Sequence, residues 1–309
     1  MDRIEELTKI VKEDPNDFQS KRELAVELLD IGENEEALSL LLSLVDIFPE
    51  DARLHYNIGI VYEKLKYFKE AIDSYVKAIN LNPQEPDFQY NLGCAYINEN
   101  NYDKALELFD FVLSCDKDDP NCLFNIGLIH SRQNETEKAI EYLERAIEGN
   151  PHDYIAIFYL AYEYKRQGDI ETAIQKYKEA LELCPDYSWA HFNLASIYWE
   201  LGDEVDAKYN LRKTLELNPK DIEASLLYSK ILITEEEYIK AQKVLNSAIR
   251  ENPVNGDLYY HLAQVEKEEE NFAEYRKNLE NALENYSTLS VPIDIVKKEY
   301  ENILKKGSF

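Results

Sequence analysis

The chain has 309 residues, of which 61 are acidic and 34 are basic, and its formal net charge is −27. This excess of negative charge argues against non-specific binding to nucleic acid or to an anionic membrane surface. No run approaches the roughly 18–20 apolar residues of a membrane-spanning helix, and the N-terminus lacks the basic and apolar regions of a secretory signal, so we expect a cytoplasmic protein.

The first predicted element is an amphipathic helix over residues 2–14. Its apolar residues Ile4, Leu7, Ile10 and Val11 fall on one face of the helix.

A proline then recurs with a fixed period of 34 residues, which Lys117 alone interrupts: Pro15, Pro49, Pro83, Pro151, Pro185, Pro219 and Pro253. A fixed period without insertions indicates one supersecondary unit stacked along a line. Counting back from each proline gives eight complete units over residues 18–289, in which the proline is position 32. Because no linker-like segment divides them, we expect one continuous body.

Two helices of about 14 residues are predicted in each unit. Position 8 is always small (Ala, Gly or Ser), and position 20 is Ala in seven units and Tyr275 in the eighth. Small residues at both places allow the two helices to pack closely, so a bulky residue there should destabilise by overpacking. Position 15 holds residues that tolerate the left-handed conformation at a helix end: Gly32, Gly168, Gly202, Asn100 and Asn134.

The last predicted element is a helix over residues 292–305. It places a second set of apolar residues on one face: Ile295, Val296, Tyr300, Ile303 and Leu304.

With this pattern the chain resembles the tetratricopeptide repeat proteins over residues 18–289, although the tryptophan common at position 4 of that family is absent from every unit. The resemblance implies an all-α, right-handed α-solenoid of helix-turn-helix repeats. We expect residues 1–17 and 290–309 to form terminal capping helices. The alternative is that one terminal helix docks into the groove of a neighbouring molecule.

Motifs for catalysis or metal binding are missing. The four cysteines form no CxxC pair, and no Gly-rich phosphate loop, nucleophile elbow or HExxH motif is present. Each of the five histidines falls at a repeat position that explains it. We therefore expect a protein that is not an enzyme and has neither cofactor nor metal.

The resemblance implies that the first helices line a concave groove, into which positions 2, 5, 6, 9, 12 and 13 point. Position 6 carries an asparagine ladder, and an amide can pair with a peptide unit as donor and acceptor at once. Position 5 carries an aromatic line, and the two tryptophans of the chain fall at groove positions. The alternative is that these residues are inherited by duplication and merely line the groove. The candidate peptide-binding residues are Tyr56, Asn57, Tyr90, Asn91, Phe124, Asn125, Arg132, Phe158, Tyr159, Tyr162, Lys165, Arg166, Trp189, Phe192, Asn193 and Trp199.

Charge in the predicted groove differs from that of the whole chain, because eight basic and eight acidic residues cancel there. The fourth and fifth units contribute Arg132, Lys165 and Arg166 without a groove acid. This stretch would suit a guest with an aromatic or aliphatic anchor beside a carboxylate.

These patterns predict a protein–protein interaction scaffold that holds an extended peptide segment of a partner protein. Two alternatives are a self-assembling scaffold, hence a homo-oligomer, and a regulatory subunit of an enzyme complex. Nucleic acid and membrane are not expected as partners.

Overall fold

The computed structural model describes residues 2–305, and over that range the chain consists of helices, with no strand. Its contacts divide it into two compact halves with the boundary between Pro151 and His152. They are called unit 1 and unit 2 from here on, and each 34-residue segment is called a repeat. The sequence predicts one continuous body instead. The division falls in a turn between the fourth and fifth repeats, where no linker interrupts the period. Since each repeat packs only on its neighbours, a long array has no single core to join its two halves.

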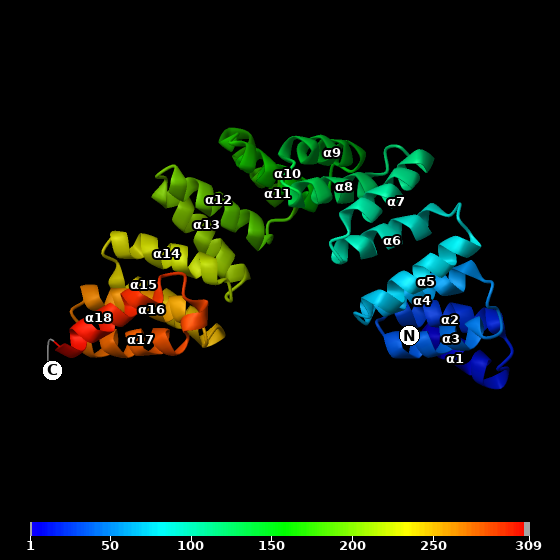
Figure 1. The fold of residues 1–309 in the computed structure, drawn as a ribbon, viewed down its shortest axis with the longest axis horizontal. Coiled ribbons are helices and arrows are strands. Elements are labelled where there is room, and N and C mark those ends of the chain that lie inside the picture. The colour runs from blue at the N-terminus through cyan, green and yellow to red at the C-terminus, as the bar shows by residue number, and fades with distance from the viewer. Residues whose placement is uncertain (1, 306–309) are drawn as a thin grey trace. The chain divides into compact units, whose positions relative to one another are not determined.

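Unit 1 contains a leading helix and four helical hairpins (Figure 1). Its helices are α1 (Asp2–Glu13), α2 (Phe18–Asp30), α3 (Asn34–Val45), α4 (Ala52–Lys64), α5 (Phe68–Leu81), α6 (Pro86–Asn98), α7 (Tyr102–Cys115), α8 (Pro120–Arg132) and α9 (Thr136–Gly149). The predicted pair of helices per repeat is thus confirmed, and the even-numbered helix is the first of each pair.

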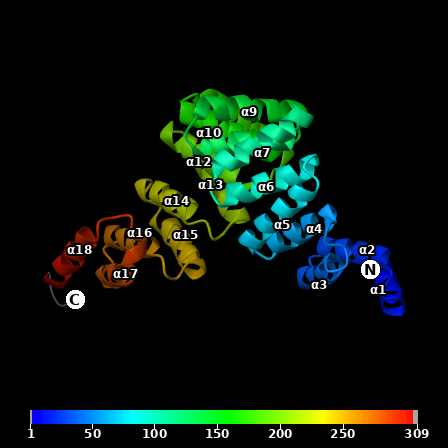
Figure 2. The same cartoon turned by 45° about the vertical axis from the view of Figure 1, so that its right-hand side comes forward.

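Unit 2 repeats the pattern with four further hairpins and a final helix (Figures 1 and 2). Its elements are α10 (Tyr154–Gln167), α11 (Ile170–Leu183), α12 (Ser188–Glu200), α13 (Glu204–Leu217), α14 (Ile222–Thr234), α15 (Tyr238–Glu251), α16 (Gly256–Glu268), α17 (Phe272–Glu284), the short 3-10 helix η1 (Tyr286–Thr288) and α18 (Ile293–Lys305).

Close approach of the two helices explains the small residues at position 8. A Cβ atom added to Gly59 would lie 2.5 Å from the Tyr75 ring, and one added to Gly93 would lie 2.7 Å from the Phe109 ring. Both distances are too short for real atoms, so the aromatic residue at position 24 fills the space that the glycine leaves. The predicted close packing is confirmed.

At repeat position 4, where the family's tryptophan is missing, the side chain contacts the carbonyl oxygen of the preceding proline in four repeats. Gln89 Nε2 donates to the carbonyl of Pro83 at 3.2 Å, and Tyr259 OH donates to that of Pro253 at 3.2 Å. His55 Nε2 lies 2.8 Å from the carbonyl oxygen of Pro49, and His191 makes the same contact. Position 4 therefore fastens the first helix to the proline turn before it.

Both terminal helices pack on their own unit. Leu7 of α1 is buried against Leu24 and Leu28 of α2, and Val296 of α18 is buried against Leu279 of α17. In both views α18 lies beside α16 and α17 (Figures 1 and 2). This is the packing that a capping role requires.

Glu299 of α18 also accepts hydrogen bonds from three side chains of the last repeat. Its carboxylate accepts from Tyr275 OH at 3.0 Å, from Gln264 Nε2 at 3.0 Å and from Tyr260 OH at 3.5 Å. Burial is the largest cause that raises the pKa of Tyr275, and the nearby Glu299 charge adds to it. The Tyr275 hydroxyl therefore stays protonated and keeps its role as a donor. This also explains the unusual Tyr275 at position 20, whose hydroxyl reaches the final helix.

All eight residues at position 15 adopt positive φ angles, including three that are neither glycine nor asparagine: Lys66, Glu236 and Glu270. The sequence did not predict the left-handed conformation for these three. It is unfavourable for a residue with a Cβ atom, and the hydrogen bond from Lys66 N to Glu63 O helps to hold the helix end there.

Replacing Lys66 by glycine should therefore stabilise the protein by about 0.5–1 kcal/mol, because glycine adopts the observed φ of 68° without strain. The same replacement at Lys77, which is exposed inside α5, should destabilise by about 1 kcal/mol. Urea unfolding followed by circular dichroism measures both. A Lys66→Gly protein no more stable than the native chain would contradict the strain argument.

Replacing Glu299 by alanine should destabilise the protein by about 2 kcal/mol, since three donors lose their acceptor. The control is Glu301→Ala on the same helix, where the side chain is exposed and lies 3.9 Å from Lys305, and this change should cost less than about 0.5 kcal/mol. Hydrogen exchange of α16–α18 locates the effect. Equal protection in the two variants would show that Glu299 is not an anchor.

Candidate peptide-binding surface

The predicted binding residues lie on the first helix of each repeat, at positions 2, 5, 6, 9, 12 and 13, which we call the first-helix face. Unit 1 presents this face on α2, α4, α6 and α8, and unit 2 presents it on α10, α12, α14 and α16. Neighbouring first helices within a unit contact each other through these positions, as the hydrogen bonds below show.

In unit 1 the asparagine ladder and the aromatic line are joined. Asn91 Nδ2 donates to Tyr56 OH at 2.7 Å, and Asn125 Nδ2 donates to Tyr90 OH at 2.9 Å. In each case the amide at position 6 reaches the tyrosine at position 5 of the preceding repeat. These two asparagines therefore connect successive repeats, a role that the sequence did not predict.

The rings of these two tyrosines pack against other aromatic rings. The Tyr56 ring lies 4.7 Å from that of Phe88 and 5.9 Å from that of Tyr75, while the Tyr90 ring lies 5.8 Å from that of Phe109. Burial raises the pKa of both phenols. Both hydroxyls are therefore neutral at physiological pH and accept the amide hydrogen bond.

Asn57, at the same repeat position, has no such partner. The preceding position 5 is Arg22, which forms an ion pair with Asp51 instead, and within the described residues Asn57 makes no side-chain hydrogen bond. Phe124 is half-buried, and Arg132 is exposed at the end of α8. A cavity of about 450 Å³ opens beside Tyr90, lined also by Asp87 and Asn121. Unit 1 thus combines two structural asparagines with one that is available.

In unit 2 the fifth repeat departs from the expectation at Phe158. This side chain is only 7% exposed, and its ring packs against those of Tyr177 at 5.5 Å and Tyr187 at 5.0 Å. Tyr159 packs on its edge at 5.4 Å. Because it is enclosed by aromatic rings, Phe158 supports the face and offers no surface to a guest.

Asn193 is the one ladder residue whose preceding position 5 is a phenylalanine. Phe158 has no hydroxyl to accept its amide, and Asn193 Nδ2 donates at 2.9 Å to the carbonyl of Trp189, one turn earlier in its own helix. The second amide hydrogen and the carbonyl oxygen make no hydrogen bond within the described residues. Asn193 therefore remains able to pair with a peptide unit.

Large aromatic side chains belong to the same face as Asn193. Trp189 is 56% exposed and Tyr162 is 39% exposed, whereas Trp199 and Phe192 are half-buried. Lys230 of α14 lies over the Trp199 ring, 6.0 Å from its centre. Exposed aromatic clusters of this kind are typical of surfaces that a partner covers.

The basic residues of the fifth repeat are engaged with acids of their own unit. Lys165 Nζ donates to Ser196 Oγ at 3.1 Å and lies 3.7 Å from Glu200. Arg166 forms an ion pair of 3.0 Å with the fully buried Glu163. The expected guest carboxylate would thus compete with acids already in place. Ser196 and Lys230 were not predicted as contacts, although both occupy position 9 of the face.

Among the described residues, no group of histidine, cysteine and acidic side chains could hold a metal ion, and no helix has the length and apolar character of a membrane span.

A double-mutant cycle can measure how much the Asn125–Tyr90 hydrogen bond contributes to the free energy of unfolding. Asn125→Ala and Tyr90→Phe should each destabilise, and the double variant should cost about 1 kcal/mol less than their sum, because the singles lose the same bond. Asn193→Ala is the control: it should be neutral or slightly stabilising, since alanine is the better helix former. Urea unfolding measures the four free energies. Additive single effects would contradict a role in joining repeats.

Comparisons with known proteins agree with the repeat pattern. Family models described as TPR repeat and tetratricopeptide repeat match residues 67–99 and 161–202, 89–151, 142–175 and 200–265, which together cover residues 67–265 without a gap. No curated protein sequence matches the chain significantly.

Similar solved structures share the fold at low identity. A chain of the APC/C hetero-tetramer Cut9–Hcn1 is 20% identical, with a TM-score of 0.63 over 85% of this chain and 52% of that one, so the present chain spans about half its length. A monomeric mutant of IFIT1 with Gppp-AAAA is 18% identical, with a TM-score of 0.56 over 90% and 75% of the two chains. MamA from Desulfovibrio magneticus RS-1 is 23% identical, with a TM-score of 0.51 over 56% and 97%. With its unbroken 34-residue period and paired helices, this chain belongs to the tetratricopeptide repeat family.

Proposed function

We propose that the chain is a non-enzymatic scaffold that holds an extended peptide segment of a partner protein on its first-helix face. The tetratricopeptide fold supports a protein–protein interaction scaffold. The observation that carries the finer proposal is the pair Trp189 and Asn193, one helical turn apart on α12. Neither is used to join repeats, and both offer groups to a guest.

The spacing of neighbouring first helices supports a guest peptide in an extended conformation. Packed helices lie on the order of 10 Å apart, and an extended chain rises about 3.3 Å per residue. Equivalent side chains on neighbouring first helices would then meet the guest at about every third residue. Asn193 would pair with one peptide unit, while Trp189 and Tyr162 would cover an apolar side chain of the guest.

The preferred guest anchor is aromatic or aliphatic. A carboxylate beside it is a weaker part of the proposal, because Lys165 and Arg166 already lie near Glu200 and Glu163. A guest carboxylate would gain most from Lys165, whose present acid is 3.7 Å away and largely exposed.

Self-assembly through a terminal helix is the second candidate. It would require α1 or α18 to leave its unit, which would expose the buried Leu7 or Val296. Light scattering over a concentration series separates the two: a monomer at every concentration argues for the scaffold, and a concentration-dependent dimer argues for assembly.

The test begins with peptides selected for binding to the native chain from a displayed library of random sequences. Trp189→Ala and Asn193→Ala should each weaken their binding at least tenfold, about 1.4 kcal/mol, because each removes an anchor of the guest. Since the chain has only two tryptophans, a Trp199→Phe background isolates Trp189, and its fluorescence should change on binding.

The control for this test is Tyr286→Ala. Tyr286 is a similarly exposed aromatic residue, 61% accessible, on η1 and outside the first helices. It should leave the affinity unchanged. Selected peptides that bind the Trp189 and Asn193 variants as tightly as the native chain would refute the proposed surface.

A further inference from the structure

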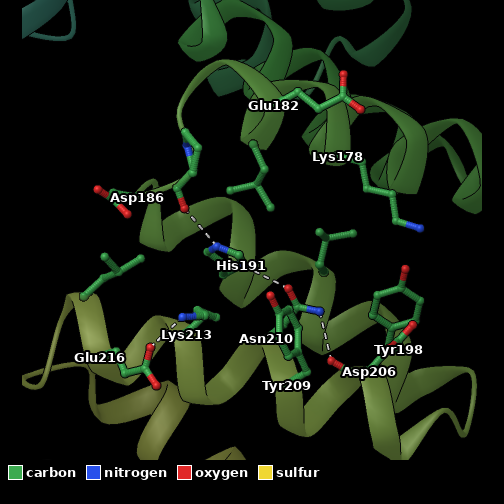
Figure 3. Close-up of a pocket in the computed structure, with 14 residues that line it drawn as sticks. Lys178, Glu182, Asp186, His191, Tyr198, Asp206, Tyr209, Asn210, Lys213 and Glu216 are labelled. Carbon is green, nitrogen blue, oxygen red and sulfur yellow. Dashed lines mark hydrogen bonds and ion pairs between the residues drawn. The ribbon is translucent and has the colours of Figure 1, made fainter.

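Unit 2 also contains a cavity on the side of α12 opposite to the candidate peptide-binding surface. Its volume is about 690 Å³, and its walls are the second helices α11 and α13, with α12 between them as the floor (Figure 3). The floor residues His191, Leu194 and Tyr198 are repeat positions 4, 7 and 11, whereas Trp189 and Asn193 are positions 2 and 6. One helix therefore serves two separate surfaces.

The floor of this cavity is fixed by hydrogen bonds. His191 Nδ1 lies 2.9 Å from Asn210 Oδ1, and its Nε2 lies 3.1 Å from the carbonyl oxygen of Pro185. The Asn210 amide in turn donates to the carbonyl of Asp206 at 2.9 Å. His191 and Asn210 are both buried, and these bonds connect α12 with α13 and with the preceding turn. These bonds hold the floor residues in place, so the groups that can bind a guest lie on the walls.

The walls carry an excess of negative charge. Four carboxylates and two lysines line the cavity. Lys178 lies over the Tyr198 ring at 5.8 Å, and Lys213 pairs with Glu216 at 2.8 Å. Three carboxylates, Glu182, Asp186 and Asp206, are left without a salt bridge among the described residues, and Figure 3 shows them around the rim.

Apolar surface lies between these carboxylates. Tyr209 is 50% exposed, Leu217 is 37% exposed, and Leu181 and Pro185 complete the lining. An arginine side chain combines the features that such walls complement: a planar guanidinium that binds carboxylates through two hydrogen bonds, stacks on aromatic rings and is weakly hydrated. A lysine ammonium lacks the planar face that Tyr209 could stack on.

We propose that this cavity receives an arginine side chain from a basic segment of a partner protein. The guanidinium pairs with a carboxylate of the rim, and its aliphatic stem and an apolar neighbour cover Tyr209 and Leu217. The volume exceeds what one side chain needs and accommodates a short segment. The acidic surface of the whole chain accelerates the approach of such a partner.

The neighbouring cavity of the next repeat differs in charge. It measures about 320 Å³ and is lined by Arg212 and Lys243 with a single acid, Glu216. The excess of carboxylates between α11 and α13 is therefore not repeated between α13 and α15.

The experiment uses the full chain and a blocked pentapeptide, acetyl-Gly-Leu-Arg-Leu-Gly-amide, with leucine methyl groups of the protein observed by NMR. Binding should shift the methyl signals of Leu181, Leu194 and Leu217 in a saturable way. The peptide with citrulline in place of arginine has the same shape without the charge, and it should bind at least tenfold more weakly. Glu182→Gln with Asp206→Asn should weaken binding of the arginine peptide to the same degree.

A control variant separates the cavity from the general attraction of an acidic protein. Glu251→Gln with Glu280→Gln removes the same charge from exposed positions of α15 and α17 in the same unit, and it should leave the affinity within twofold of the native value. The proposal is overturned by absent shifts at these leucines, by equal binding of the citrulline peptide, or by equal weakening in the control.

Discussion

Close contact between the two helices of each repeat is the constraint on which this structure depends. The absence of a side chain at Gly59 and Gly93 lets the rings of Tyr75 and Phe109 lie against the first helix. The same small-and-large pairing fixes the rotation of the first helix about its axis in each repeat. Because the period is constant, equivalent residues of neighbouring repeats are then brought to equivalent places, and a contact made once can be made again.

Repetition explains why the position-6 asparagines differ in role although they look alike in the sequence. A hydroxyl at position 5 of the preceding repeat recruits the amide, as Tyr56 does for Asn91. Where that residue is a phenylalanine, the next position 6 is released from this role, and Asn193 bonds within its own helix. The residue at position 5 thus decides the role of the asparagine at position 6 of the next repeat. After a tyrosine the asparagine joins repeats, and after a phenylalanine it can bind a guest.

The helix pairs, their boundaries and the close packing could be predicted from the sequence, because each depends on residues within one period. The left-handed conformation at Lys66 could not, since lysine gives no local signal for it and only the equivalence to Gly32 and Asn100 implies it. The burial of Phe158 was missed for a related reason: Tyr187, which covers it, lies in an inter-repeat turn outside the positions assigned to the face. The cavity between α11 and α13 has no sequence motif, because it is a space left by side chains of three helices.

Helix α12 carries apolar side chains on both its packed side and its first-helix face. Over Ser188–Glu200 its mean hydropathy is among the higher values of the first helices, and it has little amphipathic character. A helix that packed on one side and met water on the other would show a clear polar face. Instead, its apolar and aromatic residues surround the axis: Leu194 and Tyr198 face the cavity, whereas Trp189 and Phe192 belong to the first-helix face. Leu194 and Tyr198 are buried, whereas Trp189 is 56% exposed. Exposed apolar area is costly unless it is covered, so this feature of α12 supports a partner on the first-helix face.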